Sequence, residues 1–148
     1  MTYMESLLRH SLAAVAYRSA RVLQGAPNAF EYFQAGEDTR PAGKILAHMG
    51  DLFDWALSMA EGNMKWQESS PLLWEQEVAR FFAALQSLDD YAASGKPMNA
   101  SPERLLQGPI ADSLTHVGQL AMMRRMAAAP VKAENYYKAD IITGKLNY

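Results

Sequence analysis

Two of the three histidines in this sequence lie among apolar residues at helical spacing. One of them, His116, follows Asp112 by four residues in the stretch IADSLTHVGQLAMMRRM, residues 110–126. Side chains four residues apart lie one above the other on the same face of a helix. A carboxylate and an imidazole in this arrangement can bind one metal ion together, and they can equally form a local ion pair. The spacing alone leaves both interpretations open.

A second inward-facing imidazole is expected at His48, in the stretch KILAHMGDLF. It shares a helical stripe with apolar side chains, namely Ile45, Leu52 and Trp55. Two imidazoles and one carboxylate form a ligand set that divalent zinc, nickel, iron or manganese accepts, and three protein ligands leave positions open for water or substrate. His48, Asp112 and His116 are therefore the candidate metal ligands. The alternative for His48 is a core histidine bonded to a backbone carbonyl or to Asp51.

Side chains around these three residues can support such a site. Gln119 lies one turn after His116, where it can hold the outer nitrogen of a ligating imidazole or stay in solvent. Asp51 and Asp54 can orient His48 or pair with an arginine of the last helix. An apolar pocket lined by aromatic side chains is a further possibility, with Trp55, Trp66, Tyr136 and Tyr137 as the candidates. His10, next to Arg9, is expected at the surface.

The elements that must position these residues are helices. Apolar periodicity and helix-terminating residues predict long helices over about residues 3–23, 40–61, 71–94 and 109–128. Thr39 is the expected cap of the second helix, Ser70–Pro71 starts the third, and Gly108–Pro109 breaks a short helix before the last. With no convincing strand, the sequence predicts an all-α fold, a four-helix bundle formed by residues 1–148 as one domain. The tail, residues 131–148, is expected to pack across the end of the bundle.

Composition narrows the function classes. The chain has 14 basic and 16 acidic residues, a formal net charge of -2, so no electrostatic surface for nucleic acid or an anionic membrane is expected. It has no cysteine, which excludes disulfides, thiolate metal sites and a cysteine nucleophile, and agrees with a cytoplasmic location. Charged residues interrupt the apolar N-terminal stretch, which therefore predicts neither a signal peptide nor a membrane span. Apolar surface at Met122 and Met126, next to Met123, predicts a homodimer.

Three stretches carry a family resemblance: RPAGKILAHMGDL, GPIADSLTHVGQLAMMRRMAAAPV and KAENYYKADI. In order and spacing, the chain resembles the DinB/YfiT-like superfamily of metal-dependent enzymes. The resemblance implies a bundle in up-down-down-up order, often dimeric, whose metal is bound by one histidine of the second helix and two of the fourth. By position these ligands are His48, Asp112 and His116. Asp112 departs from the family, where histidine is usual, and this bears on which metal is bound.

The resemblance also implies an activity. Such proteins include transferases that use a low-molecular-weight thiol, so the expected function is a metal-dependent transferase or a hydrolase acting on a small molecule. A metal that lowers the pKa of a bound thiol or water would supply the nucleophile. The alternative is a helical dimer that binds a metal or small ligand without turnover, as a stress-related protein. The sequence does not choose the substrate.

Overall fold

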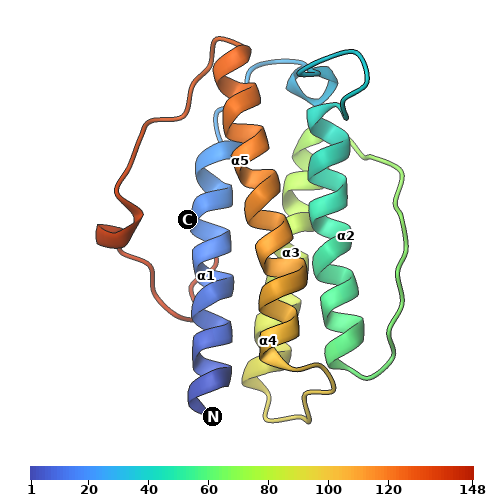
Figure 1. The fold of residues 1–148 in the computed structure, drawn as a ribbon, viewed down its shortest axis with the longest axis vertical. Coiled ribbons are helices and arrows are strands. Elements are labelled where there is room, and N and C mark those ends of the chain that lie inside the picture. Colours follow the sequence, from blue (N-terminus) through green and yellow to red (C-terminus); the bar gives the residue numbers. More distant parts are fainter.

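The computed structural model describes residues 1–148 and contains helices but no strands. Four long helices form a bundle, and a one-turn helix, α4, precedes the last of them (Figure 1). Their bounds are α1 Tyr3–Leu23, α2 Ala42–Ala60, α3 Trp74–Ala93, α4 Pro102–Leu105 and α5 Ala111–Met126. The expected helical bundle is therefore observed. No helix has both the length and the apolar composition needed to cross a membrane.

The core lies between the four long helices. Helices α1 and α2 each pack against both α3 and α5. Large apolar side chains from all four helices are fully buried there, among them Leu12, Leu46, Phe53, Phe81 and Leu120. Burial of each such side chain contributes about 1.5–3 kcal/mol, so this shared core fixes how α2 and α5 face each other.

Helix α1 begins and ends where the sequence predicts. The Thr2 hydroxyl accepts a hydrogen bond from the Glu5 amide at 3.1 Å, and the Glu5 carboxylate accepts one from the Thr2 amide at 2.7 Å. This reciprocal pair satisfies two amides at the helix start that have no partner within the helix. At the other end, Gly25 adopts a positive φ of 69°, which ends the helix as expected.

The start of α2 differs from the prediction. Pro41, not Thr39, is the residue that caps this helix, and it offers no side-chain hydrogen bond. The Thr39 hydroxyl instead closes a turn with Gly36, accepting from its amide at 2.9 Å and donating to its carbonyl at 2.8 Å. A hydroxyl already engaged in a preceding turn is not free to cap the helix that follows.

The start of α3 is also displaced. The helix begins at Trp74, after the expected Ser70–Pro71 signal, and Leu72 and Leu73 are exposed. Residues 61–73 instead form an extended segment that runs back along the outside of α2 (Figure 1). The amide of Ser69 donates to Asp51 Oδ2 at 3.0 Å, which ties this segment to α2. Tertiary anchoring therefore overrides the local start signal.

Contrary to the prediction, the Gly108–Pro109 pair does not separate the short helix from the last one, because the chain stays helical through it. A π-helical turn over Leu106–Ile110 joins α4 to α5, and Pro109 is buried within it. The wider turn accommodates a residue that lacks an amide hydrogen without ending the helix. Because this turn immediately precedes α5, it affects the direction in which the Asp112 side chain points from the axis of that helix.

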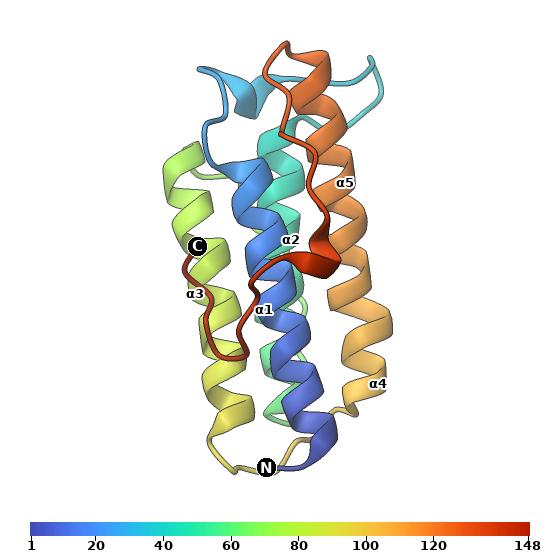
Figure 2. The same cartoon turned by 90° about the vertical axis from the view of Figure 1, so that its left-hand side faces the viewer.

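The tail lies along α1, not across the end of the bundle as expected. After α5 the chain runs down the side of α1 and ends beside α3 (Figure 2). Leu146 is buried, and the ring of Tyr148 packs edge-on against Tyr17 with centroids 5.0 Å apart. Glu134 forms a salt bridge with Arg21 at 3.0 Å. The tail therefore covers the face of the bundle away from α2.

Candidate metal centre

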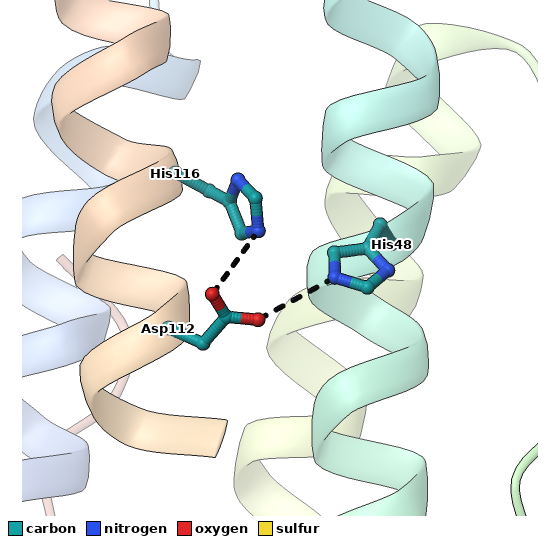
Figure 3. Close-up of side chains that lie close together, drawn as sticks. All are labelled: His48, Asp112 and His116. Atoms are coloured by element: carbon teal, nitrogen blue, oxygen red, sulfur yellow. Dashed lines mark ion pairs between the residues drawn. The ribbon is translucent and has the colours of Figure 1, made fainter. Parts of the chain in front are cut away.

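The three candidate ligands converge between two helices. His48 lies in the middle of α2, and Asp112 and His116 project from the first half of α5, which packs against α2. Their side chains point toward one another across the space between these helices (Figure 3). Each offers one donor atom, and these three atoms all lie within 4.8 Å of one another. The fold thus brings the whole predicted set together.

The three side chains lie at ion-pair distances, slightly longer than a direct hydrogen bond, and these distances are also compatible with ligands of one ion. Asp112 Oδ2 lies 3.5 Å from His48 Nε2, and Asp112 Oδ1 lies 3.6 Å from His116 Nε2. Direct N–H···O hydrogen bonds span about 2.7–3.2 Å, so both separations are too long. Donor atoms around a tetrahedral ion with bonds of about 2.1 Å lie about 3.4 Å apart. The two measured separations are close to that value and involve different oxygens of Asp112, and with one donor atom from each residue the three atoms lie within 4.8 Å of one another.

The three candidate ligands differ in how exposed they are. The Asp112 side chain is 46% exposed, whereas those of His48 and His116 are 23% and 12% exposed. The buried stripe of α5 runs instead through Ser113 and Val117. Asp112 therefore lies at the mouth of the site, where water reaches its carboxylate. A bound cation is inferred because three donor atoms converge. It is not inferred from burial of the Asp112 carboxylate.

Gln119 fixes the orientation of His116. The Nδ1 atom of His116 lies 2.8 Å from Oε1 of Gln119. Because an amide oxygen only accepts hydrogen bonds, Nδ1 carries the proton and donates it to Gln119. Nε2 then presents its lone pair toward Asp112 and His48, which is the tautomer that binds a metal. Gln119 is exposed, as one of its two expected placements had it, and it also lies within hydrogen-bond distance of His116.

The surroundings of His48 favour its neutral form. Burial lowers the pKa of His48, the positive charges of His116 and Arg40 lower it further, and Asp112 only partly opposes them. The rings of His48 and His116 are nearly perpendicular, at 88°, with centroids 5.0 Å apart. A neutral imidazole is the ligand form, so protons compete weakly for this side chain near neutral pH.

None of the four aromatic residues that were candidates for the pocket wall lines the pocket at the three donors, and of these only Trp66 contacts a candidate ligand. Trp66 packs edge-on against His48 with ring centroids 5.7 Å apart, and Trp55 packs against Trp66 at 5.7 Å. Tyr136 lies on the tail, where its ring packs against Tyr17 of α1. Tyr137 is 97% exposed. The prediction that these two tyrosines line the pocket is therefore wrong, because the tail follows α1.

A pocket of about 650 Å³ opens onto the three donors. Its wall combines polar and apolar side chains, and the lining residues outside the donor set are Ala35, Thr39, Arg40, Ile45, Gln119, Met122 and Met123. The space is large enough for a small molecule beside a bound ion. An ion held by only three protein ligands would keep further coordination positions facing this space.

The acidic residues expected to support His48 have another role. Asp51 and Asp54 each form a salt bridge of 3.0 Å with Arg80 of α3, and neither pairs with an arginine of α5. His10, expected at the surface, is exposed and lies 2.9 Å from the Thr143 hydroxyl. Arg40 lines the pocket and was not predicted from the sequence. It precedes α2, so helical spacing does not place it beside His48.

Comparisons with models of protein families, with curated proteins and with solved structures find no match to this chain. The geometry of the site and the chemistry of its side chains therefore carry the functional argument.

Proposed function

We propose that this chain is a metal-dependent enzyme of the DinB/YfiT-like superfamily, acting on a small molecule. One observation carries the proposal: a histidine of α2 and an aspartate and a histidine of α5 bring their donor atoms within 4.8 Å at a pocket. The up-down-down-up order is part of the proposal. It is supported by residues 61–73, which run along α2 and allow α3 to start near the end where α2 starts.

The side chains at this site would have different roles. His48 and His116 would supply neutral nitrogen ligands, and Asp112 would supply a negatively charged oxygen that offsets part of the charge of the ion. Gln119, 2.8 Å from Nδ1 of His116, would accept a hydrogen bond from that nitrogen. Met122 and Met123 offer apolar contact to a substrate in the pocket. A divalent zinc, nickel, iron or manganese ion held here would lower the pKa of a water or a low-molecular-weight thiol.

Metal binding is tested first, on protein purified without an affinity tag. We expect about one divalent ion per chain and a lower melting temperature after chelation, because an ion that binds only the folded state stabilises it. Trp66 lies 5.7 Å from His48, so tryptophan fluorescence should change on titration with zinc, nickel, manganese or iron. An unchanged melting curve and unchanged fluorescence with all four metals would refute the site.

Turnover is tested next, because a binding protein without activity would give the same metal result. Electrophilic small molecules are screened with several thiols and with water, using metal-loaded and chelated protein. Metal-dependent product formation supports an enzyme. Stoichiometric metal binding without any turnover supports the alternative, a non-catalytic binding protein.

The role of Asp112 can be tested through metal selectivity. Asp112→His recreates a three-histidine set and removes an anionic oxygen ligand. Selectivity should then shift by about tenfold or more toward zinc, nickel and copper and away from manganese and iron, following ligand softness. Competitive metal binding at fixed pH measures the shift. Equal selectivity in the two proteins would show that Asp112 is not a ligand.

A homodimer is also part of the proposal. Met122 and Met126 on α5 are 58% and 51% exposed, and Leu106 in the preceding turn is 48% exposed. Exposed apolar side chains at helical spacing are suited to packing against the same surface of a second copy. Light scattering at micromolar concentrations should report a mass of twice 16.4 kDa. A particle of the single-chain mass throughout this range would exclude the dimer.

A further inference from the structure

One cation lines the pocket beside the three donors, and it has no acidic partner. Arg40 is the only lysine or arginine among the lining residues. Arg40 is exposed and, like Arg18, Arg104, Arg124 and Arg125, forms no salt bridge, whereas Arg9, Arg21 and Arg80 pair with carboxylates. An unpaired guanidinium presents a planar set of donors that suits a carboxylate. The pocket therefore contains a positive group without a counterion from the chain.

Arg40 lies two residues before the start of α2. It also lines a second pocket, of about 490 Å³, which lies beside His48 and is lined by Lys44, Asp51 and Glu68 as well. Because that second pocket contains two carboxylates, the pocket at the three donors is the more favourable place for an anion beside Arg40.

The rest of the pocket wall is suited to the apolar part of a ligand. Ile45 lies on the α2 side, and Met122 and Met123 lie on the α5 side, with Met122 58% exposed. Methionine side chains adapt to apolar ligands of different shapes. The only acidic residue in the lining is Asp112, whose charge a bound cation would offset. With a divalent ion present, the pocket would carry a net positive charge.

From this arrangement we infer that the pocket binds a small organic anion, whose carboxylate pairs with Arg40 and whose apolar body contacts Met122 and Met123. The assignment of this anion as the substrate class rests on the proposed function. The binding of the anion does not, because Arg40 and the methionines belong to the chain whether or not a metal is bound.

The probe is hexanoate, and hexanamide serves as its neutral match. Binding is measured by calorimetry or by NMR titration with wild type, Arg40→Gln and Lys44→Gln. Lys44 is the matched control, because it is a nearby cation that lines only the neighbouring pocket. We expect hexanoate affinity to fall about tenfold in Arg40→Gln, as for loss of one charged hydrogen-bonded partner, and to remain unchanged in Lys44→Gln. Hexanamide should bind more weakly than hexanoate and equally to all three proteins.

Each titration is run with chelated protein and again with zinc. Hexanoate binding to chelated wild type that depends on Arg40 supports the inference, even if zinc does not bind and the proposed function fails. Equal hexanoate affinity in wild type and Arg40→Gln overturns the inference, even if zinc binds. Binding seen only with zinc and independent of Arg40 also overturns it, since the carboxylate then binds the metal alone. No hexanoate binding to wild type in either state overturns it as well.

Discussion

Two clusters of ionisable side chains contact α2, and they differ in where their positive charge comes from. In the first, Arg80 of α3 bonds to Glu77 at 2.8 Å, to Asp51 at 3.0 Å and to Asp54 at 3.0 Å. It also bonds to the Ala47 carbonyl at 2.7 Å and to the Ser69 hydroxyl at 3.0 Å. In the second cluster, the donors of the metal centre face one another without a lysine or arginine between them.

The Arg80 cluster anchors segments of the fold, whereas the metal centre is a candidate binding site. Burial by itself lowers the pKa of Arg80, but the hydrogen bond and charge of Glu77 and the charge of Asp51 outweigh this effect and raise the pKa. The side chains of Asp51 and Glu77 are almost fully buried. The Arg80 cluster thus has a cation from the chain itself, one guanidinium for three carboxylates, and it holds α2, α3 and residues 61–73 together. The metal centre leaves its donor atoms available to a ligand.

The largest effect on stability is expected when the Arg80 cluster loses its cation. Arg80→Met leaves the buried carboxylates of Asp51 and Glu77 without a cation, and the free energy of unfolding should fall by about 3 kcal/mol. Urea unfolding followed by circular dichroism measures the change. Arg125→Met is the matched control, because Arg125 is exposed and unpaired, and it should stay within about 0.5 kcal/mol of wild type. Equal stability of the two variants would show that the Arg80 cluster does not anchor the fold.

The metal centre should respond in the opposite way. Asp112→Ala is expected to lower metal affinity by about 100-fold or more, since even loss of a residue that only supports a ligand costs about 10–100-fold. The stability of the metal-free protein should change by less than about 0.5 kcal/mol, because this carboxylate is 46% exposed. Isothermal titration and urea unfolding give the two quantities. Asp54→Ala, in the other cluster, should leave metal affinity unchanged; a similar loss there would contradict the separation.

Alanine substitutions at two glycines test whether the Arg80 cluster is more rigid than the helix that carries Asp112 and His116. A Cβ at Gly50 of α2 would lie 2.8 Å from the Arg80 guanidinium, whereas a Cβ at Gly118 of α5 would meet nothing within 4 Å. Alanine is favoured over glycine in a helix by about 0.8–1 kcal/mol, so Gly118→Ala should stabilise the protein. Gly50→Ala should destabilise it by about 1 kcal/mol despite the same gain, because five hydrogen bonds hold Arg80 in place. If thermal unfolding shows both variants stabilised, the Arg80 cluster is not rigid.

The smallest expected effect is the dependence of the stability of the metal-free protein on pH. The pKa of His48 is lowered in the folded protein, so the unfolded chain binds a proton first as the pH falls. Metal-free protein should therefore lose stability between about pH 7 and 5, by less than about 0.5 kcal/mol because the ring is partly exposed. His48→Gln should remove this contribution. With metal bound the loss should be steeper, because protons compete for both imidazoles. Unfolding curves that are parallel over this range with and without metal would exclude the imidazoles as ligands.

Much of the fold follows from local signals. The bounds of α1 agree with the prediction because Thr2, Glu5 and Gly25 act within one helical turn of the ends they define. The starts of α2 and α3 were predicted wrongly, because Thr39 and Ser69 are engaged by turns and by tertiary contacts. Local patterns therefore predict a helix more reliably than the residue at which it begins.

By itself the sequence determined the number of long helices, the apolar stripes and the residue types of the candidate ligands. These depend on periodicity and on side-chain chemistry, which are local properties of the chain. Only the tertiary structure decided which face of α5 is buried, since Asp112 and Ser113 are adjacent and differ by about 100° of rotation around the helix axis. It also decided that Arg80 meets Asp51 and that Arg40 meets the pocket. Such pairings join residues of different segments, and only the packing of the whole core brings those segments together.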